Sequence, residues 1–264
     1  MDASETHPCR VVPAEPAAAR GRCQGVWQIV QFNRRFYLAT LAGGAAVLLA
    51  ALRAPALWRT LLLAGASPAL FWLASSLLVS WYVYDHSPLF RLGWLAGCLS
   101  ETPRRWVNIH AGLDETSHLL AALFPRSEGR VLDIYDPREM TEPSIEAARR
   151  LARTAATPAL WRALPLADGS CDAAFLMFAA HELRRHDARV QLFREVARAL
   201  RPGGQLVLLE HLRDWANFAA FGPGFLHFFP RRAWLRAAAE AGLETHPHFS
   251  GTPFVHVFVM RRPS

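Results

Sequence analysis

The stretch LPLADGSCDAAFLMFAAHELRRHDARVQLFREVARALRPGGQLVLLEH, residues 164–211, decides the fold class of this chain. Within it, residues 171–180 form a short apolar run that predicts a buried β-strand, and residues 184–200 repeat apolar side chains at helical spacing. Pro202, followed by two glycines, ends that helix, and residues 205–212 form another apolar run. A strand, a helix and a strand in this order predict a parallel β-α-β unit.

The same alternation continues on both sides of this unit. We predict strands at 105–111, 130–136 and 159–164, helices at 114–124, 137–154 and 230–242, and a terminal antiparallel pair from 243–250 and 254–262. This order predicts an α/β protein with a Rossmann-like parallel sheet and a terminal antiparallel hairpin. Ligands of such sheets bind at the carboxyl ends of the strands, here near Ala111, Asp136, Ala180 and Glu210.

Two long apolar segments precede this domain. Residues 36–52 and 61–84 contain no charged side chain, and only the short connection RAPALWRT separates them. Segments of this length predict a transmembrane helical hairpin over 36–84, preceded by a poorly ordered tail, 1–35, and followed by the α/β domain, 85–264. A signal peptide and a buried core hairpin are the alternatives. The first fits poorly because a second apolar run follows, and the second because core helices seldom stay uncharged for so long.

The basic side chains bear on orientation and on partners. The net charge is +7, every basic side chain is arginine, and the arginines are scattered rather than clustered with aromatic residues, so we expect no nucleic-acid partner. More arginines flank the predicted hairpin than lie in its connection, which predicts that both of its ends face the cytoplasm. The expected location is therefore the inner (cytoplasmic) membrane, as a multi-pass protein with its domain in the cytoplasm.

Several short motifs in residues 164–211 carry a family resemblance. They are Leu164-Pro165, Asp168-Gly169, Asp172 at the start of a strand, and Leu200-Arg201-Pro202-Gly203-Gly204 before the next strand. In order and spacing they resemble the second half of class I S-adenosylmethionine-dependent methyltransferases, and the likeness extends over roughly 82–262. The pair Glu210-His211 and the aromatic stretch behind it are similar to membrane-associated small-molecule and lipid methyltransferases.

The resemblance implies an S-adenosylmethionine site whose glycine-rich loop is degenerate. Of the three loop glycines of the family only Gly112 remains, Asn108 replaces an acid, and Leu160 stands where an acid usually contacts adenine. Asp136, before Pro137, matches the acid that binds the ribose hydroxyls, although it is equally suited to begin a helix. The cofactor-binding residues implied are Asn108, His110, Gly112, Leu113, Asp136, Pro137 and Phe178.

The acceptor side of the predicted site contains His181 and Glu210. We predict that they act as catalytic residues, with His181 a base or hydrogen-bond partner of an acceptor hydroxyl or thiol, although each could serve structure alone. No ligand spacing supports a metal site, even though His110, His181 and His211 end three different strands. The aromatic residues between 215 and 229 predict either a lid over an apolar substrate or a contact with the bilayer.

Two functions of different kinds follow from the sequence. The first is methyl transfer from S-adenosylmethionine to a hydrophobic or membrane-associated small-molecule or lipid acceptor. The second is a catalytically silent methyltransferase-like domain that acts as a membrane scaffold or regulator, which the lost glycines and acids favour. A different reaction of the same cofactor is a third alternative.

Overall fold

A mixed eight-stranded sheet forms the centre of the molecule. The computed structural model describes residues 21–151, 156–246 and 249–264. The strands are β1 (Arg105–His110), β2 (Glu128–Asp133), β3 (Thr157–Pro158), β4 (Cys171–Met177), β5 (Leu200–His211), β6 (Glu244–Thr245), β7 (Phe249–Thr252) and β8 (Val255–Arg261). Their order is β3-β2-β1-β4-β5-β8-β6, with β7 paired to β8. β1 to β5 are mutually parallel, and β8 is antiparallel to β5, which confirms the predicted Rossmann-like sheet with antiparallel strands at its end.

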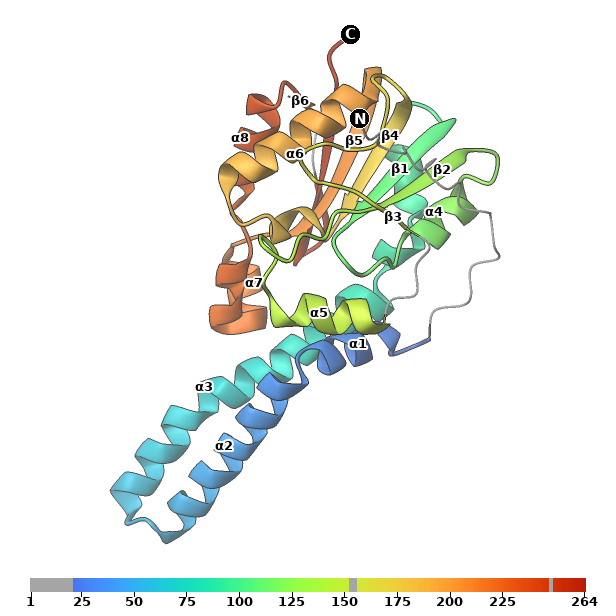
Figure 1. Cartoon of the computed structure of the whole chain (residues 1–264). Helices are drawn as coiled ribbons and strands as arrows, with labels where there is room; N and C mark the ends of the chain where they lie inside the picture. Colours follow the sequence, from blue (N-terminus) through green and yellow to red (C-terminus); the bar gives the residue numbers. More distant parts are fainter. Residues whose placement is uncertain (1–20, 152–155, 247–248) are drawn as a thin grey trace, which may run out of the picture.

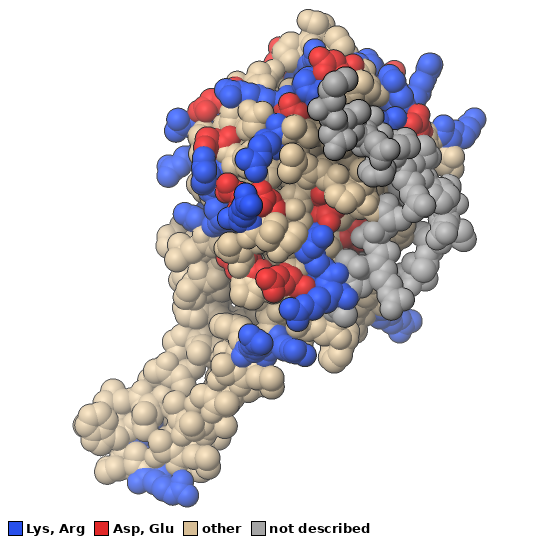
Figure 2. Space-filling model, in the orientation of Figure 1, with Lys and Arg blue, Asp and Glu red and all other residues tan. Residues whose placement is uncertain are grey.

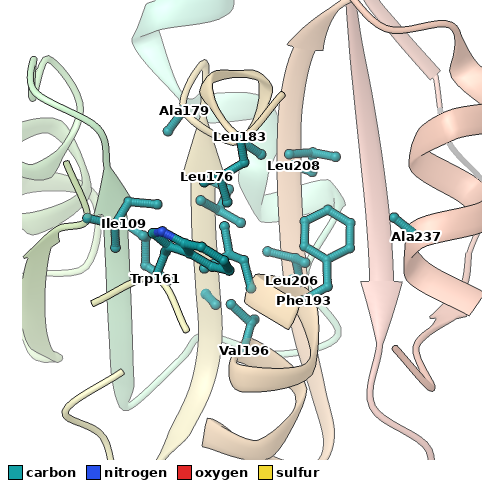
Figure 3. Packing of buried hydrophobic residues seen from close by; sticks show 14 of the residues in the cluster. Ile109, Trp161, Leu176, Ala179, Leu183, Phe193, Val196, Leu206, Leu208 and Ala237 are labelled. Carbon is teal, nitrogen blue, oxygen red and sulfur yellow. The ribbon is translucent and has the colours of Figure 1, made fainter. Parts of the chain in front are cut away.

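Helices cover both faces of this sheet (Figure 1). The helical segments are α1 (Gln24–Phe32), α2 (Arg34–Arg53), α3 (Ala56–Trp81), η1 (Tyr82–His86), η2 (Pro88–Arg91), η3 (Gly93–Gly97), α4 (Ser117–Leu123), α5 (Pro143–Leu151), η4 (Ala180–Glu182), α6 (His186–Ala199), α7 (Trp215–Phe221), η5 (Gly222–His227) and α8 (Arg231–Glu240). On one face α6, α8 and the segment around Trp161 bury a large apolar cluster, and Figure 3 shows Phe193 of α6 beside Leu206 and Leu208. The second cluster, with Trp106 and Phe175, packs under α4, η2, η3 and the end of α3.

Two predicted elements differ from the structure between β2 and β4. The helix predicted over 137–154 begins at Pro143, because residues after Asp136 form a turn in which the amides of Glu139 and Met140 donate to the Asp136 carbonyl. Residues 152–154 of that prediction lie outside the described residues. The strand predicted over 159–164 is reduced to the two-residue β3 and one bridge between Leu160 and Ala163.

The segment predicted as a poorly ordered tail is in part a helix. Residues 1–20 lie outside the described residues, but Gln24–Phe32 form α1, which packs against α5 and α3. The carboxylate of Asp85 accepts hydrogen bonds from the amides of Gly25 and Val26, at 2.7 and 2.9 Å. A carboxylate bound to the first free amides of a helix stabilises that helix end, which the sequence prediction missed.

The two apolar segments form an antiparallel helical hairpin, α2 and α3, that projects from the domain (Figure 1). Both helices are long and apolar enough to cross a membrane, by length and composition alone. Their apolar side chains are mostly exposed, as Leu52 and Leu57 are at 70% and 68%. In Figure 2 the visible face of the hairpin is uncharged between basic side chains at its tip and at its junction with the domain.

Asp172, at the start of β4, ties three segments together and gives a prediction for stability. Its carboxylate accepts the amides of Arg104 and Arg105 at 2.8 and 2.7 Å and pairs with Arg201 Nε at 2.8 Å. We expect Asp172→Ala to lower the free energy of unfolding by about 2 kcal/mol at neutral pH, since a charged acceptor is lost. Chemical denaturation in detergent, followed by tryptophan fluorescence, would measure this loss.

The contribution of Asp172 has a defined pH dependence. Burial alone would raise the pKa of Asp172, but the hydrogen bonds from Arg105, Arg201 and Arg104 outweigh it and lower the pKa. A depressed folded-state pKa stabilises the protein above the unfolded-state value, so the difference from Asp172→Ala should shrink as the pH falls below about 4. Asp187→Ala, which breaks an exposed pair with Arg185, is the control and should change stability little at any pH. If Asp172→Ala lowered the free energy of unfolding by the same amount at every pH, the lowered pKa of Asp172 would be contradicted.

Candidate functional site

A cavity of about 210 Å³ lies at the carboxyl ends of the central strands. Its wall combines the segments after β1 and β4, the start of α5, η1 and the helix α1; its lining residues include Gln28, Ile29, Phe32, Tyr84, Ala111, Leu113, Ile145, Phe178 and Glu182. β1 lies between β2 and β4, so the crossovers run in opposite directions from this point, which is where open α/β sheets bind ligands. Of the predicted cofactor residues, Leu113 and Phe178 line this cavity.

Asn108 and His110 point into the protein at the end of β1. The Asn108 amide is buried and donates hydrogen bonds to Ser117 Oγ at 2.8 Å and Thr116 Oγ1 at 3.0 Å, at the start of α4. His110 Nδ1 accepts the amide of Gly112 at 3.2 Å, and burial lowers the pKa of His110. Its Nε2 atom is buried with no hydrogen-bond partner among the described residues. Both side chains therefore shape the loop after β1 rather than line the cavity.

Gly112 has a backbone conformation that favours glycine, and its surroundings are crowded. Its φ is +120°, a value that favours glycine. A Cβ atom at this position would lie 2.9 Å from Arg149 Cγ and 3.1 Å from Ile145 Cγ2, both on α5. On the side of Gly112 toward which a Cβ would point, the space is thus filled by side chains of α5, which crosses the carboxyl ends of the strands beside α1 (Figure 1).

The acid at the end of β2 is Asp133, three residues before the predicted Asp136. Asp133 is level with His110 in the β1–β2 register, and its Oδ2 atom pairs with Arg149 Nη1 at 2.5 Å. Asp136 lies in the following turn, where it accepts the amide of Arg138 at 3.0 Å and lies 3.3 Å from Arg162 Nη2; Pro137 is in the same turn. The sequence prediction extended this strand to Asp136, whereas the strand ends at Asp133, which directly follows its apolar pair.

His181 and Glu210, the two predicted acceptor-side residues, are in contact. His181 Nδ1 lies 2.7 Å from Glu210 Oε2, and His181 Nε2 lies 3.3 Å from Glu182 Oε1. Burial alone would lower the pKa of His181, but the two carboxylates outweigh it and raise the pKa to about 10. Glu210 is wholly buried behind His181, whereas Glu182, which the sequence prediction did not single out, lines the cavity. Nearby, burial and the charge of His181 lower the pKa of His227 to about 4.

A second polar pair joins the cavity wall to β5. Tyr84 Oη lies 2.9 Å from His211 Nε2, while His211 Nδ1 lies 2.9 Å from the carbonyl oxygen of Phe254. Burial lowers the pKa of His211 to about 4, so the imidazole is neutral at pH 7. Because Nδ1 donates to the carbonyl, Nε2 accepts from the tyrosine hydroxyl. The pair was missed because its residues are far apart in sequence.

The backbone of Phe178 is strained where the chain leaves β4. Its φ is +54°, a left-handed value that is costly for a bulky residue. The ring is fixed by aromatic contacts with Phe90, Tyr84 and His211 at centroid distances of 6.1, 5.7 and 5.2 Å. Strained residues of this kind concentrate at ligand sites, which agrees with the position of Phe178 in the cavity wall.

Comparisons with known proteins bear on the fold and the family of this domain. Residues 129–208 match the family model described as a methyltransferase domain. Among solved structures, the mitomycin 7-O-methyltransferase MmcR has a TM-score of 0.54 and 17% identity over 92% of this chain and 74% of its own. A protein from Pyrococcus horikoshii OT3 has a TM-score of 0.51 and 14% identity over 66% of this chain and 89% of its own. No curated protein matches the sequence.

The family match and the fold together assign the domain. At this identity the two structures establish the fold, and the family match extends from β2 to β5. It leaves out β1 and its loop, the part of the predicted site in which only one glycine remains. The chain contains an S-adenosylmethionine-dependent methyltransferase domain.

The residues present fit this cofactor, with one obstruction. Gly112, with its positive φ, and Asp133 lie at the ends of neighbouring strands. There the backbone at Gly112 can hold the methionine part of S-adenosylmethionine, and the Asp133 carboxylate can hold its ribose. The cavity beside Ala111 and Phe178 continues from them toward Glu182. Arg149 occupies the Asp133 carboxylate, so it has to move aside before a ribose can bind there.

Proposed function

We propose that the methyltransferase domain of this chain methylates a hydrophobic acceptor that reaches it from a membrane, to which α2 and α3 anchor the protein. One observation carries this proposal: the cavity wall and the first apolar helix belong to one continuous segment. α1 lines the cavity through Gln28, Ile29 and Phe32, and Asn33 alone separates α1 from α2. The cavity therefore lies where the hairpin leaves the domain, and much of its wall is apolar.

Membrane anchoring is supported by the surface of the hairpin. In the most apolar windows of α2 and α3 only 11% and 6% of the residues are buried inside the protein. A core hairpin of a soluble domain would bury these side chains, and a bilayer would cover them instead. Two helices of 20 and 26 residues also have the length for the hydrocarbon layer.

The aromatic segment after β5 supports a bilayer contact next to the cavity. α7 packs along α3, where the rings of Phe218 and Trp72 meet edge to face at 5.5 Å and Ser75 Oγ donates to the Ala219 carbonyl oxygen at 3.3 Å. Trp215 and Leu226 remain exposed, at 83% and 55%. An exposed tryptophan beside a spanning helix suits the membrane interface, so α7 and η5 would lie against the lipid head groups.

The proposed orientation predicts which side of the membrane each part occupies. In a chain whose four cysteines are replaced by serine, Ala54→Cys, in the hairpin connection, should react with a membrane-impermeant maleimide on intact cells. A cysteine restored at position 23, at the start of α1, should react only after the membrane is opened, because both ends of the hairpin face the cytoplasm. Labelling of position 23 on intact cells would contradict this topology.

Glu182 is the residue that would accept a proton from the acceptor. Burial alone would raise the pKa of Glu182, but His181 outweighs it and lowers the pKa, so the carboxylate is ionised in the cavity wall. It can accept a hydrogen bond from an acceptor hydroxyl or thiol and take its proton, while His181 and Glu210 hold it in place. S-adenosylmethionine supplies the electrophilic methyl group, and alignment of the two reactants provides most of the catalysis.

Two measurements test the proposed function. Calorimetric titration of detergent-purified protein with S-adenosylmethionine should show saturable binding. Incubation with methyl-labelled cofactor and a total membrane lipid extract should then transfer label to the organic phase. A matched sample with Glu182→Gln should bind cofactor and transfer less label. Binding without any lipid-soluble product would exclude a hydrophobic acceptor present in that extract.

A specific observation favours the silent alternative. Arg149 and Ile145 fill the space before Gly112, and Arg149 neutralises Asp133, as expected of a domain that no longer binds a nucleoside. The same titration separates the alternatives. A silent scaffold should show no binding at millimolar cofactor, and its cellular role should then survive substitution of Asp133 and Glu182 but not loss of the hairpin.

A further inference from the structure

We propose that His181, Glu182 and His227 bind a divalent metal ion of the Zn²⁺ class at the wall of the cavity. One ligand atom from each of these three side chains lies within 4.8 Å of the others. His181 and Glu182 are in η4, directly after β4, and His227 ends η5. Two imidazoles and one carboxylate are a ligand set that Zn²⁺ takes in catalytic sites, where it keeps one position open.

The distances fit a single ion after a small movement. Two ligands at tetrahedral angles on one Zn²⁺, with bonds of about 2.0–2.1 Å, lie about 3.3 Å apart. His181 Nε2 and Glu182 Oε1 are separated by 3.3 Å. The His227 ring centroid is 5.2 Å from that of His181. Its ligand atom lies within 4.8 Å of the other two, so it has to approach them by at most about 1.5 Å to reach the same spacing.

The groups around the cluster are those that a metal-binding histidine requires. A histidine ligand usually holds its second ring nitrogen against a carboxylate, which fixes the ring and the tautomer. His181 Nδ1 lies 2.7 Å from Glu210 Oε2, and Glu210 is wholly buried, so Nε2 is the atom directed toward Glu182. Arg184 Nη1 donates to the carbonyl oxygens of both His181 and His227, which joins the two ligand-bearing segments.

An independent observation shows an unused ligand atom. Glu182 Oε2 is buried and has no hydrogen-bond partner among the described residues. A buried carboxylate oxygen without a donor is costly, and a bound cation would satisfy it. Because Glu182 lines the cavity, the open position of the ion would face the acceptor.

This site deepens the proposed function, and its catalytic role rests on that function. With the ion bound, His181 and Glu182 act as its ligands, and the ion holds the acceptor oxygen or sulfur in place of the bare carboxylate. Zn²⁺ lowers the pKa of an oxygen that it binds, so it would favour the deprotonated acceptor at neutral pH. The sequence alone predicts no metal site. Of the three strand-end histidines, His110 accepts the Gly112 amide through Nδ1, and His211 Nδ1 lies 2.9 Å from the Phe254 carbonyl oxygen.

Metal binding can be measured without cofactor or acceptor. Full-length protein with a histidine-free affinity tag, stripped with EDTA in detergent, should bind one Zn²⁺ per chain in a competition titration with a chromophoric chelator. Co²⁺ should give the intense visible absorption of a four-coordinate site. Absence of stoichiometric Zn²⁺ binding by the wild-type chain would overturn the proposal, whatever the variants do.

Matched variants locate the ion. Glu210→Gln should weaken Zn²⁺ binding by about 10–100-fold, the effect expected of a residue that positions a ligand. His227→Gln and Glu182→Gln should weaken it further, whereas His186→Gln, which alters a histidine paired with Glu240, should bind as the wild type does. Equal Zn²⁺ affinity of His227→Gln and wild type would contradict the site. Methylation by the metal-free enzyme would support the proposed function and contradict a catalytic role of the ion. Zn²⁺ binding without methylation would support the metal site and contradict the proposed function.

Discussion

Gly129→Ala is expected to lower the free energy of unfolding by about 3 kcal/mol, because β2 has no room for a side chain there. A Cβ atom at Gly129 would lie 2.1 Å from Cζ2 of Trp106, a residue of β1 that is only 1% exposed. Either the indole or the strand must move, and both strands end at the predicted cofactor site. Chemical denaturation of the detergent-purified protein would measure the loss, and cofactor binding should weaken with it.

The clash can be tested separately from the loss of a glycine. The atoms that would be contacted, Cζ2, Cη2 and Cε2, belong to the outer ring of the Trp106 indole, which phenylalanine lacks. Gly129→Ala should therefore cost much less in a Trp106→Phe background than in the wild type, so the two substitutions should couple strongly. An equal loss in both backgrounds would show that contact with Trp106 is not the cause.

Asp133→Ala is expected to weaken S-adenosylmethionine binding by about 10–100-fold, whereas Asp136→Ala should have a small effect. The reason is position: Asp133 ends β2 level with His110, while Asp136 is engaged in the following turn with Arg138 and Arg162. Charge-assisted hydrogen bonds to ribose hydroxyls are worth about 1.5–3 kcal/mol, which gives the expected factor. Calorimetric titration of the two variants would decide between the acids.

Arg149 is the control for this experiment, because Asp133→Ala also releases its guanidinium. If Arg149 competes with the ribose for Asp133, Arg149→Ala should bind cofactor more tightly than the wild type. The gain should disappear when Asp133 is also replaced. Weaker binding by Asp136→Ala than by Asp133→Ala would restore the sequence-based assignment.

Local patterns in the sequence predicted the larger elements well. The strand–helix–strand order around residues 171–211 and the two apolar helices depend on side-chain periodicity, which each segment carries within itself. The strand ends were less predictable. β2 ends at Asp133 and the chain turns at Asp136, so the predicted strand is three residues too long, and Asp133 rather than Asp136 is its last residue.

The contacts that build the site depend on distant residues. α1 is held by Asp85, 60 residues beyond Gly25, and Tyr84 reaches His211 across 127 residues. Neither contact leaves a periodic trace in the sequence. The His181–Glu182–His227 cluster was missed for the same reason, since His227 comes from the irregular segment after α7. Glu182 lies one residue beyond His181, farther from the predicted strand end at Ala180, so its place in the sequence does not distinguish it.

The single residue between α1 and α2 has a mechanical consequence. Because Asn33 is the only residue between the two helices, a movement of α1 away from the cavity would also change the direction of α2. Such a movement would break the hydrogen bonds from α1 to Asp85. The direction of the apolar hairpin and the position of α1 at the cavity wall are thus coupled. If the hairpin spans a bilayer as proposed, a thicker or thinner bilayer would change the tilt of its helices and therefore the force on α1 at the cavity wall. Lipid composition would then influence the cavity mechanically, without any lipid binding to a specific site.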